Sequence, residues 1–172
     1  MNRPGLPALC FQSMEVKQLP KMVRASKPAD YLNASDVRDR LRTSNTAKQL
    51  GFVIEKAERG KVTIRMPVEE LHKQVYGVVH GGVMAALADT AGGLATYMDC
   101  PRGTRVATVE MKINFLEAVE AGTVFAEAVV VRRGRHIAVV DCDMRDDRGR
   151  LVAKALMTFF VGPFRKNRKS RS

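Results

Sequence analysis

The feature that most restricts the fold of this chain is a helix-length apolar run near its middle. The run extends from His80 to Met98 and reads H-G-G-V-M-A-A-L-A-D-T-A-G-G-L-A-T-Y-M. Its only charged residue is Asp89, and most of its other side chains are small. A helix that is apolar on every side is normally buried, and a carboxylate is among the groups least often found fully inside a protein. The run therefore predicts a central helix, and the carboxylate within it needs an explanation.

The residues around this carboxylate suggest a chemical role. Gly81 and Gly82 open the run, and bare backbone N–H groups at a helix N-terminus can stabilise a developing negative charge. Asp89 follows about two turns later on nearly the same face. Donors for an oxyanion and a general base are the minimum equipment for hydrolysing an acyl bond. Structural interpretations remain open, because paired glycines also form tight turns, a buried Asp can cap a loop, and His80 can be a hydrogen-bonded structural histidine.

The sequence on both sides of this helix predicts a further short helix and several strands. Upstream, Ser35 is the expected N-cap of a helix that continues to about Leu50 and could form a lid over the sheet. Two strands, 51–57 and 61–68, should then form a hairpin with a glycine turn. Downstream, three or four long strands are expected, at about 104–118, 122–133, 135–146 and 150–161. The breaks between them, at Ala121–Gly122, Gly134 and Arg148–Gly149, are each short enough for a hairpin turn. One apolar helix among antiparallel strands must be wrapped by the sheet to bury its surface, which predicts an α+β roll.

The same segments carry a family resemblance. The run G-V-V-H-G-G-V-M-A-A-L-A-D-T-A-G-G-L, residues 77–94, resembles the signature of hot-dog-fold acyl-CoA thioesterases of the PaaI-like, phenylacetate-pathway type. Residues 108–118 resemble the first long strand of that family, and residues 146–160 resemble its closing hairpin. The resemblance covers about residues 50–162. It implies a hot-dog fold, in which an antiparallel sheet wraps a long central helix, assembling as a dimer or a dimer of dimers.

The resemblance also implies roles for individual residues. The backbone N–H of Gly81 would polarise the thioester carbonyl, and Asp89 of the partner subunit would activate water as general base or attack as nucleophile. Thr108 stands where relatives carry a Ser or Thr that helps hold the water. His80 completes the catalytic candidates, and Gly82 is expected to contact the substrate.

One loop position departs from the family pattern. Close relatives often have Asn six residues before the His, whereas this chain has Gln74. Gln offers the same amide on a longer arm, so the role could persist or pass to Tyr76 or His72. The acyl group itself, which we expect to come from lipid metabolism or an aryl acid, would contact side chains that are equally good core residues: Val83, Met84, Leu87, Tyr97, Met111 and Phe115.

Coenzyme A carries three phosphate groups, which favour basic residues near the site. Arg132, Arg133 and Arg135 surround Gly134 at a predicted hairpin tip, and arginine suits phosphate, although an ordinary charged turn would look the same. The sequence lacks phosphate-binding loops of the GxxxxGK[ST] or GxGxxG type. We therefore expect no cofactor other than the coenzyme A of the substrate, and no metal.

Charge and cysteine content complete the expectations. The net charge is +11, but residues 51–160 carry only +1, while residues 1–50 and 161–172 carry +5 each. The domain organisation expected is an irregular basic arm at 1–32, one hot-dog domain at 33–162 and a basic tail at 163–172, with no specific nucleic-acid partner. Three cysteines without C-x-x-C spacing suggest a reducing compartment. We expect a cytoplasmic homodimer or homotetramer without a transmembrane segment, or alternatively a mitochondrial matrix protein.

Two other function classes remain open at this point. A hot-dog domain can be a non-catalytic acyl-CoA-binding regulator, but the N-terminal arm offers one helix where a DNA-binding helix-turn-helix needs more. Hot-dog hydratases and dehydratases use a catalytic His with an acid in other sequence settings, and their patterns are not visible here. Release of free thiol from acyl-CoA, DNA binding and enoyl-CoA hydration would distinguish the three.

Overall fold

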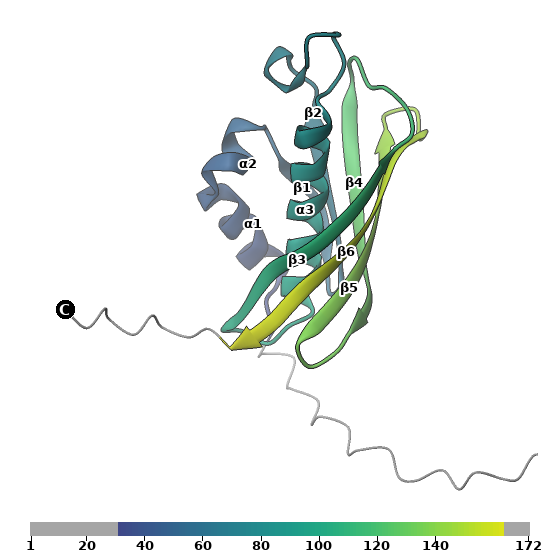
Figure 1. Cartoon of the computed structure of the whole chain (residues 1–172). Helices are drawn as coiled ribbons and strands as arrows, with labels where there is room; N and C mark the ends of the chain where they lie inside the picture. The colour runs from purple at the N-terminus through teal and green to yellow at the C-terminus, as the bar shows by residue number, and fades with distance from the viewer. Residues whose placement is uncertain (1–30, 164–172) are drawn as a thin grey trace, which may run out of the picture.

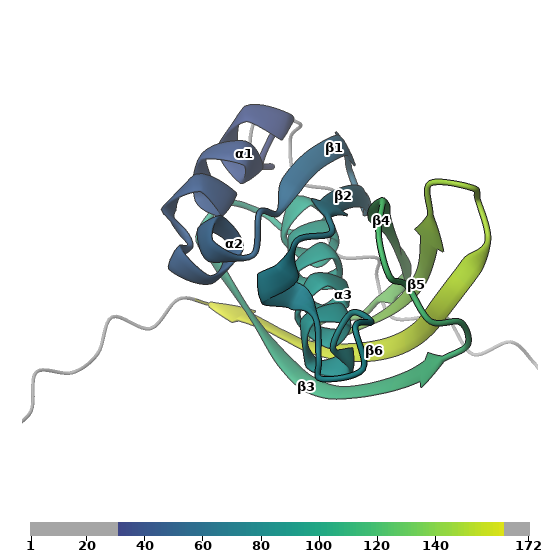
Figure 2. The same ribbon diagram turned by 90° about the horizontal axis from the view of Figure 1, so that it is seen from above.

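A six-stranded antiparallel sheet curves around one long helix in the computed structural model, which describes residues 31–163 (Figure 1). Viewed along the helix, the strands form an arc around α3 in the order β1-β2-β4-β5-β6-β3, and α1 and α2 lie beside β1 on the open side of that arc (Figure 2). The elements are α1 (Ala34–Thr43), α2 (Asn45–Gln49), β1 (Val53–Glu58), β2 (Lys61–Pro67), the 3-10 turn η2 (Glu70–His72), α3 (Gly81–Met98), β3 (Thr104–Phe115), β4 (Thr123–Arg133), β5 (Ile137–Asp146) and β6 (Leu151–Pro163).

The prediction of a hot-dog fold is therefore confirmed. The proposed basic arm at 1–32 and basic tail at 163–172 lie almost entirely outside the described residues. No helix among residues 31–163 is long and apolar enough to cross a membrane.

The central helix is buried along most of its length, as its composition predicts. Leu87, Ala88, Ala91 and Ala95 are fully shielded from solvent. Small residues let the sheet approach closely, and this is clearest at Gly92. A Cβ atom added there would lie 2.6 Å from the Cε of Met157 and 3.0 Å from the Cε2 of Phe159, both on β6.

The glycine turns of two predicted hairpins are present. Arg59 and Gly60 join β1 to β2, with Gly60 in the left-handed region at a φ of 72°. In the turn between β5 and β6, Asp146 accepts hydrogen bonds from the backbone N–H groups of Arg148 and Arg150 and from the Arg150 guanidinium. Burial alone would raise the pKa of the Asp146 carboxyl, but these hydrogen bonds outweigh it and hold the pKa below its usual value.

The expected turn at Ala121–Gly122 does not make a hairpin, so that prediction is wrong. β3 pairs with β6 along its whole length, and β4 lies three strands away between β2 and β5. The connection at 116–122 instead crosses the end of the roll. There, the Val119 carbonyl accepts from the Val79 N–H, and the Gly122 carbonyl accepts from the Val68 N–H. The reason is that the sheet has to curve around α3, and a hairpin between β3 and β4 would leave one face of α3 uncovered.

The N-terminal helix also differs from its prediction. Its N-cap is Asn33 rather than Ser35, and a reciprocal bond between the Asn33 backbone N–H and the Asp36 carboxylate completes a capping box. The helix stops at Ser44, whose hydroxyl then accepts from the Ala47 N–H and starts α2. One predicted helix is thus two short ones.

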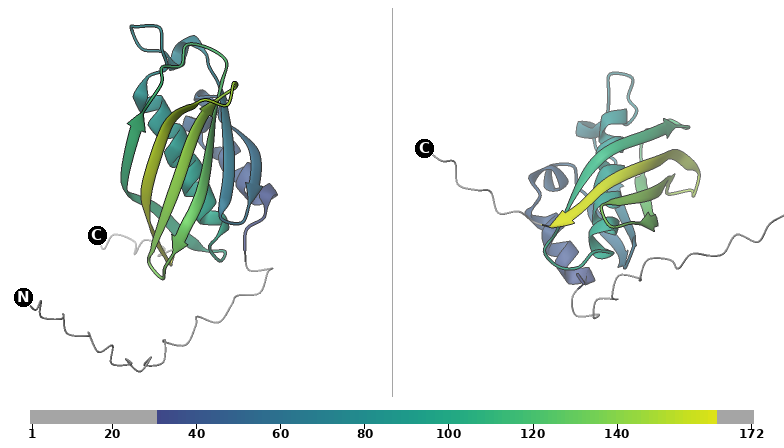
Figure 3. Two further views of the ribbon diagram at one scale, coloured as in Figure 1. Left: turned by 90° about the vertical axis from the view of Figure 1, so that its right-hand side faces the viewer. Right: turned by 60° about the horizontal axis from the view of Figure 1, so that its bottom comes forward.

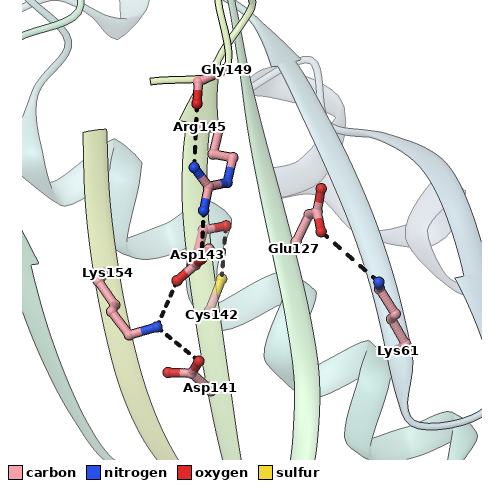
Figure 4. Close-up of polar contacts among 8 residues, drawn as sticks. All are labelled: Lys61, Glu127, Asp141, Cys142, Asp143, Arg145, Gly149 and Lys154. Atoms are coloured by element: carbon pink, nitrogen blue, oxygen red, sulfur yellow. Dashed lines mark hydrogen bonds and ion pairs between the residues drawn. The ribbon is translucent and has the colours of Figure 1, made fainter. Parts of the chain in front are cut away.

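The outer face of the sheet, which faces the viewer in Figure 3 (left), carries both charged and apolar side chains. The Lys154 ammonium binds the carboxylates of Asp141 and Asp143, Arg145 binds Asp143, and Lys61 lies 4.0 Å from Glu127 (Figure 4). Exposed apolar side chains lie on the same face: Val129, Ile137, Leu156 and Phe160. Exposed ion pairs of this kind contribute little stability individually.

Candidate active site

The N-terminus of α3 is capped by a histidine. The Nδ1 atom of His80 accepts a hydrogen bond of 2.8 Å from the Gly82 N–H, and the side chain is exposed. Within residues 31–163, the Gly81 N–H has no hydrogen-bond acceptor. His80 therefore caps the helix through Nδ1, and Gly81 presents an available donor at the positive end of the helix.

Gly81 opens into a cavity of about 340 Å³ that also includes Gln74. A Cβ atom on Gly81 would lie 3.1 Å from the ring of Phe115, so a side chain there would crowd this cavity. Neither residue suggested as a substitute for Gln74 lines it. Tyr76 is 81% exposed at the tip of its loop, whereas His72 is 1% exposed and accepts from the Glu69 N–H through its Nδ1.

Asp89 lies half-buried on α3, about two turns after Gly81. The Thr108 hydroxyl donates a hydrogen bond of 2.7 Å to its Oδ1 and fixes the carboxylate against β3. The register between β3 and β6 shifts immediately after Thr108, at a bulge where Val109 is exposed. Bulges commonly redirect side chains near functional sites. The two residues named from the family resemblance are thus in direct contact, 19 positions apart.

These two residues form one end of a cleft of about 510 Å³. Its floor is α3, one wall is formed by β3 and β6, and the other wall is formed by α1 and Ser44. This arrangement agrees with the position of α1 on the open side of the sheet (Figure 2). The lining residues are Arg40, Leu41, Thr43, Ser44, Asp89, Thr90, Gly93, Leu94, Tyr97, Val106, Ala107, Thr108 and Phe159.

Of the acyl-pocket candidates, Tyr97 lines this cleft, and Met84 and Phe115 line the Gly81 cavity. Sequence reasoning missed Arg40. It is one of three arginines at alternate positions on a polar helix, and nothing in the sequence distinguishes it from the other two.

The structure does not bring Gly81 and Asp89 to the same cavity. Eight residues of α-helix separate them, which is about 12 Å along the axis. The Gly81 cavity and the Asp89 cleft have no lining residue in common. A single carbonyl group cannot therefore contact both groups of the same chain.

The β4–β5 hairpin, which carries the predicted phosphate-binding arginines, lies outside both the Gly81 cavity and the Asp89 cleft. Gly134 forms its turn, as expected, but Arg132, Arg133 and Arg135 line neither the Gly81 cavity nor the Asp89 cleft. The Nε of Arg133 lies 3.3 Å from the carboxylate of Asp99 at the C-terminal end of α3, where Asp99 also binds Arg59. No group of three His, Cys, Asp or Glu side chains able to hold a metal is found in the described part of the chain.

Comparison with known proteins gives the family. A model of the thioesterase superfamily matches residues 76–153. A putative esterase of Haemophilus influenzae is 32% identical over 123 residues, which cover 72% of this chain and 89% of that protein. The chain belongs to the thioesterase superfamily. The proofreading thioesterase EntH of Klebsiella pneumoniae is 31% identical over 59% of this chain and 74% of its own length.

Solved thioesterase structures have the same fold. Thioesterase HI1161 of Haemophilus influenzae superimposes with a TM-score of 0.73, at 28% identity, over 80% of this chain and 95% of its own. The PaaI protein of Escherichia coli, from the phenylacetic acid degradation operon, gives 0.70 at 25% identity over 75% and 93%. A hypothetical thioesterase of Streptococcus pneumoniae, crystallised with coenzyme A, gives 0.62 at 31% over 67% and 88%. The resemblance to PaaI-like thioesterases is confirmed, and thioester hydrolysis is the general activity of the family.

Proposed function

We propose that this chain hydrolyses acyl-CoA thioesters, with Asp89 as the general base. In this mechanism Asp89 takes a proton from water as the water oxygen attacks the thioester carbonyl carbon. The carbonyl oxygen becomes an oxyanion that accepts a hydrogen bond from the Gly81 N–H. The tetrahedral intermediate then collapses, the carbon–sulfur bond breaks, and the coenzyme A thiolate takes the proton from Asp89. The products are the free acid and coenzyme A.

The observation that carries this proposal is the contact between Thr108 and Asp89. A hydroxyl 2.7 Å from one carboxylate oxygen orients the carboxylate and leaves its other oxygen for water. Because the Thr108 hydroxyl is the donor in this bond, its oxygen can still accept a hydrogen bond from the same water. A carboxylate fixed beside a cleft is the arrangement that general-base catalysis requires.

The separation of Gly81 from Asp89 supports a site shared between two subunits. A separation of about 12 Å along the helix axis is too far for one carbonyl to be held by the Gly81 N–H and attacked by water from Asp89 of the same chain, so in this proposal a second copy supplies one of the two groups. The sheet offers a surface for this pairing, because β3 is an edge strand. Val109, Phe115 and Leu116 are exposed there. We propose a homodimer as the minimal active form, and a tetramer would contain two of them.

Coenzyme A as the thiol is supported by the related structure crystallised with it. Arg132 and Arg135 remain candidates for its phosphates, with Gly82 near the thioester. Arg133 is a weaker candidate, because Asp99 already neutralises part of its charge.

Release of free thiol from octanoyl-CoA and phenylacetyl-CoA tests the reaction. We expect Asp89→Asn to lower kcat by about 100-fold or more, as is typical when a general base is lost. Thr108→Val should lower kcat on the order of tenfold, because it removes one hydrogen bond to the charged base. Asp141→Asn and Thr158→Val, on the outer face of the sheet, are matched controls and should retain full turnover. A folded Asp89→Asn protein with normal kcat would disprove the assignment.

Mixing of inactive subunits tests the shared site. Asp89→Asn chains and Gly81→Val chains should each be inactive alone. After verified subunit exchange at equal amounts, half of the dimers are hybrids, and each hybrid contains one intact site of two. About a quarter of the wild-type activity should return. No recovery, or a monomeric mass by light scattering for the active wild type, would contradict a shared site.

A further inference from the structure

The wall of the Asp89 cleft formed by α1 carries a cation stacked on an aromatic ring. The guanidinium carbon of Arg40 lies 4.2 Å from the ring centroid of Tyr97, and both residues line the cleft. Stacking on an aromatic face holds a guanidinium in one orientation. Its N–H groups point outward in the plane of the guanidinium and remain available for hydrogen bonds. The cleft thus has an oriented positive charge on the wall facing α3.

Arg40 differs from the other arginines of α1 in its contacts. Arg38 donates to the Ile54 carbonyl at 2.7 Å, and Arg42 pairs with Asp39 at 3.2 Å. Within residues 31–163, the Arg40 guanidinium has neither a carboxylate partner nor a hydrogen-bond acceptor. Its donors are therefore available to a ligand in the cleft.

Apart from Arg40 and Tyr97, the polar side chains of the cleft each make at least one hydrogen bond. The hydroxyl of Thr43 donates to the Arg40 carbonyl, and the hydroxyl of Thr90 donates to the Ala86 carbonyl. The hydroxyl of Ser44 caps α2, and Thr108 and Asp89 are bonded to each other. Among the described residues, the Arg40 guanidinium is the charged donor without a partner that this cleft offers to an additional polar group of a substrate, beside the neutral hydroxyls of Tyr97 and Ser44.

The distance from the reacting carbonyl sets the kind of group that fits. Tyr97 follows Asp89 by eight residues, about 12 Å along the axis of α3. Between them the cleft is lined mainly by apolar or small residues: Gly93, Leu94, Val106, Ala107 and Phe159. A thioester at Asp89 would therefore extend along an apolar path before it meets the cation.

We propose that Arg40, positioned by Tyr97, makes this cleft selective for acyl groups whose far end carries a carboxylate. The proposal rests on the hydrolysis of acyl-CoA at Asp89 proposed above. A planar guanidinium binds a carboxylate through two parallel hydrogen bonds, and its desolvation is less costly than that of an ammonium. The phosphates of coenzyme A are a poorer fit, because the long pantetheine arm separates them from the sulfur.

The test compares two acyl groups of equal length on two thiols. Octanoyl and 7-carboxyheptanoyl (suberyl) groups, which have the same number of carbons, are assayed as thioesters of coenzyme A and of N-acetylcysteamine, which lacks phosphates. Arg40→Ala should raise KM for both suberyl thioesters on the order of 10- to 100-fold, the range for a lost hydrogen-bonded charge. Because this contact is remote from the reacting bond, kcat should change less than KM. Both octanoyl thioesters should change by less than about threefold.

Further variants separate recognition from structural damage. Arg42→Ala, on the same helix but outside the Asp89 cleft, should leave all four substrates unchanged. Arg40→Lys keeps the charge without the planar fork and should recover part of the suberyl activity. Tyr97→Leu removes the stacking surface and should raise the suberyl KM in the same direction.

Each other outcome has a definite meaning. If Arg40→Ala raises KM for both coenzyme A thioesters and for neither N-acetylcysteamine thioester, Arg40 binds phosphate and the inference is wrong. If it leaves the suberyl KM unchanged while the wild type hydrolyses octanoyl-CoA, the inference fails and the proposed hydrolase function stands. If the folded wild type releases no thiol from any of the four thioesters, the proposed function itself fails.

Discussion

Substitution by alanine should stabilise the protein at Gly93 but not at its neighbour Gly92. Replacing Gly by Ala inside a helix stabilises it by about 1 kcal/mol. At Gly93 the new methyl would lie 3.7 Å from the Phe159 ring, an ordinary contact, so Gly93→Ala should raise the free energy of unfolding by about 0.5–1 kcal/mol. At Gly92 the methyl would overlap the terminal methyl of Met157 at 2.6 Å and touch the Phe159 ring at 3.0 Å; the Met157 side chain is flexible, but both residues are buried in the core and can move aside only by displacing other core side chains. Overpacking of this kind costs about 1–3 kcal/mol.

The two effects nearly cancel at Gly92 or leave a net loss of up to about 2 kcal/mol. The two alanine variants should therefore differ by about 1–3 kcal/mol in the free energy of unfolding, with Gly93→Ala the more stable. Urea unfolding followed by circular dichroism, at one fixed protein concentration, measures this difference. The fixed concentration matters because subunit association would also contribute to the measured stability.

A second-site change identifies the cause. Met157→Val removes the methyl group that Gly92→Ala would strike, so the penalty of Gly92→Ala should be smaller in the Met157→Val background. A coupling free energy of at least about 0.5 kcal/mol is expected for residues in contact. If Gly92→Ala stabilises the protein as much as Gly93→Ala does, or shows no coupling to Met157, close packing of α3 against β6 does not explain the glycine.

Three further predictions concern other parts of the molecule. Asp146 has a lowered pKa when folded, so it contributes stability above about pH 4 that is lost as the pH falls further; Asp146→Asn should flatten the acid limb of a stability–pH curve. Burial raises the pKa of Cys100 to about 11 and that of Cys142 to about 12, so a Cys10→Ser protein should react with Ellman's reagent at pH 8 only after unfolding. Asn33→Ala removes the α1 cap and should lower the free energy of unfolding by about 1 kcal/mol, measured by urea titration.

The sequence predicts the parts of this fold that depend on local pattern. An apolar run with small side chains identifies α3, and glycines that bound β-rich segments identify most strand ends. Local turn chemistry does not specify which strands pair. Ala121–Gly122 has the composition of a hairpin turn, yet β3 pairs with β6 because the sheet must enclose α3. The start of α1 is ambiguous for a similar reason, since Asn33 and Ser35 are both good caps and the capping box with Asp36 decides between them.

Some residues of the candidate site can likewise be predicted from the sequence, and others are found only from the structure. The family signature points to Gly81 and Asp89, and the structure adds that they open into different cavities of one chain. The Arg133–Asp99 ion pair joins residues 34 positions apart, and no sequence spacing indicates it. Arg40 enters the site only because α1 folds back beside β1 and faces Tyr97. Contacts of this kind depend on tertiary packing, which periodicity and motif spacing do not encode.

The two short helices that close the open side of the sheet have a consequence for changing the substrate preference of this protein. The family model matches residues 76–153, which include Gly81, Asp89 and Thr108, whereas the α1 wall precedes that segment. The residues that line the far end of the cleft on α1 therefore lie on a different segment from the residues proposed to take part in the reaction. Under the proposed roles of Arg40 and Asp89, replacing residues 31–50 with the matching segment of a relative should change the preference for the end of the acyl group and retain hydrolysis.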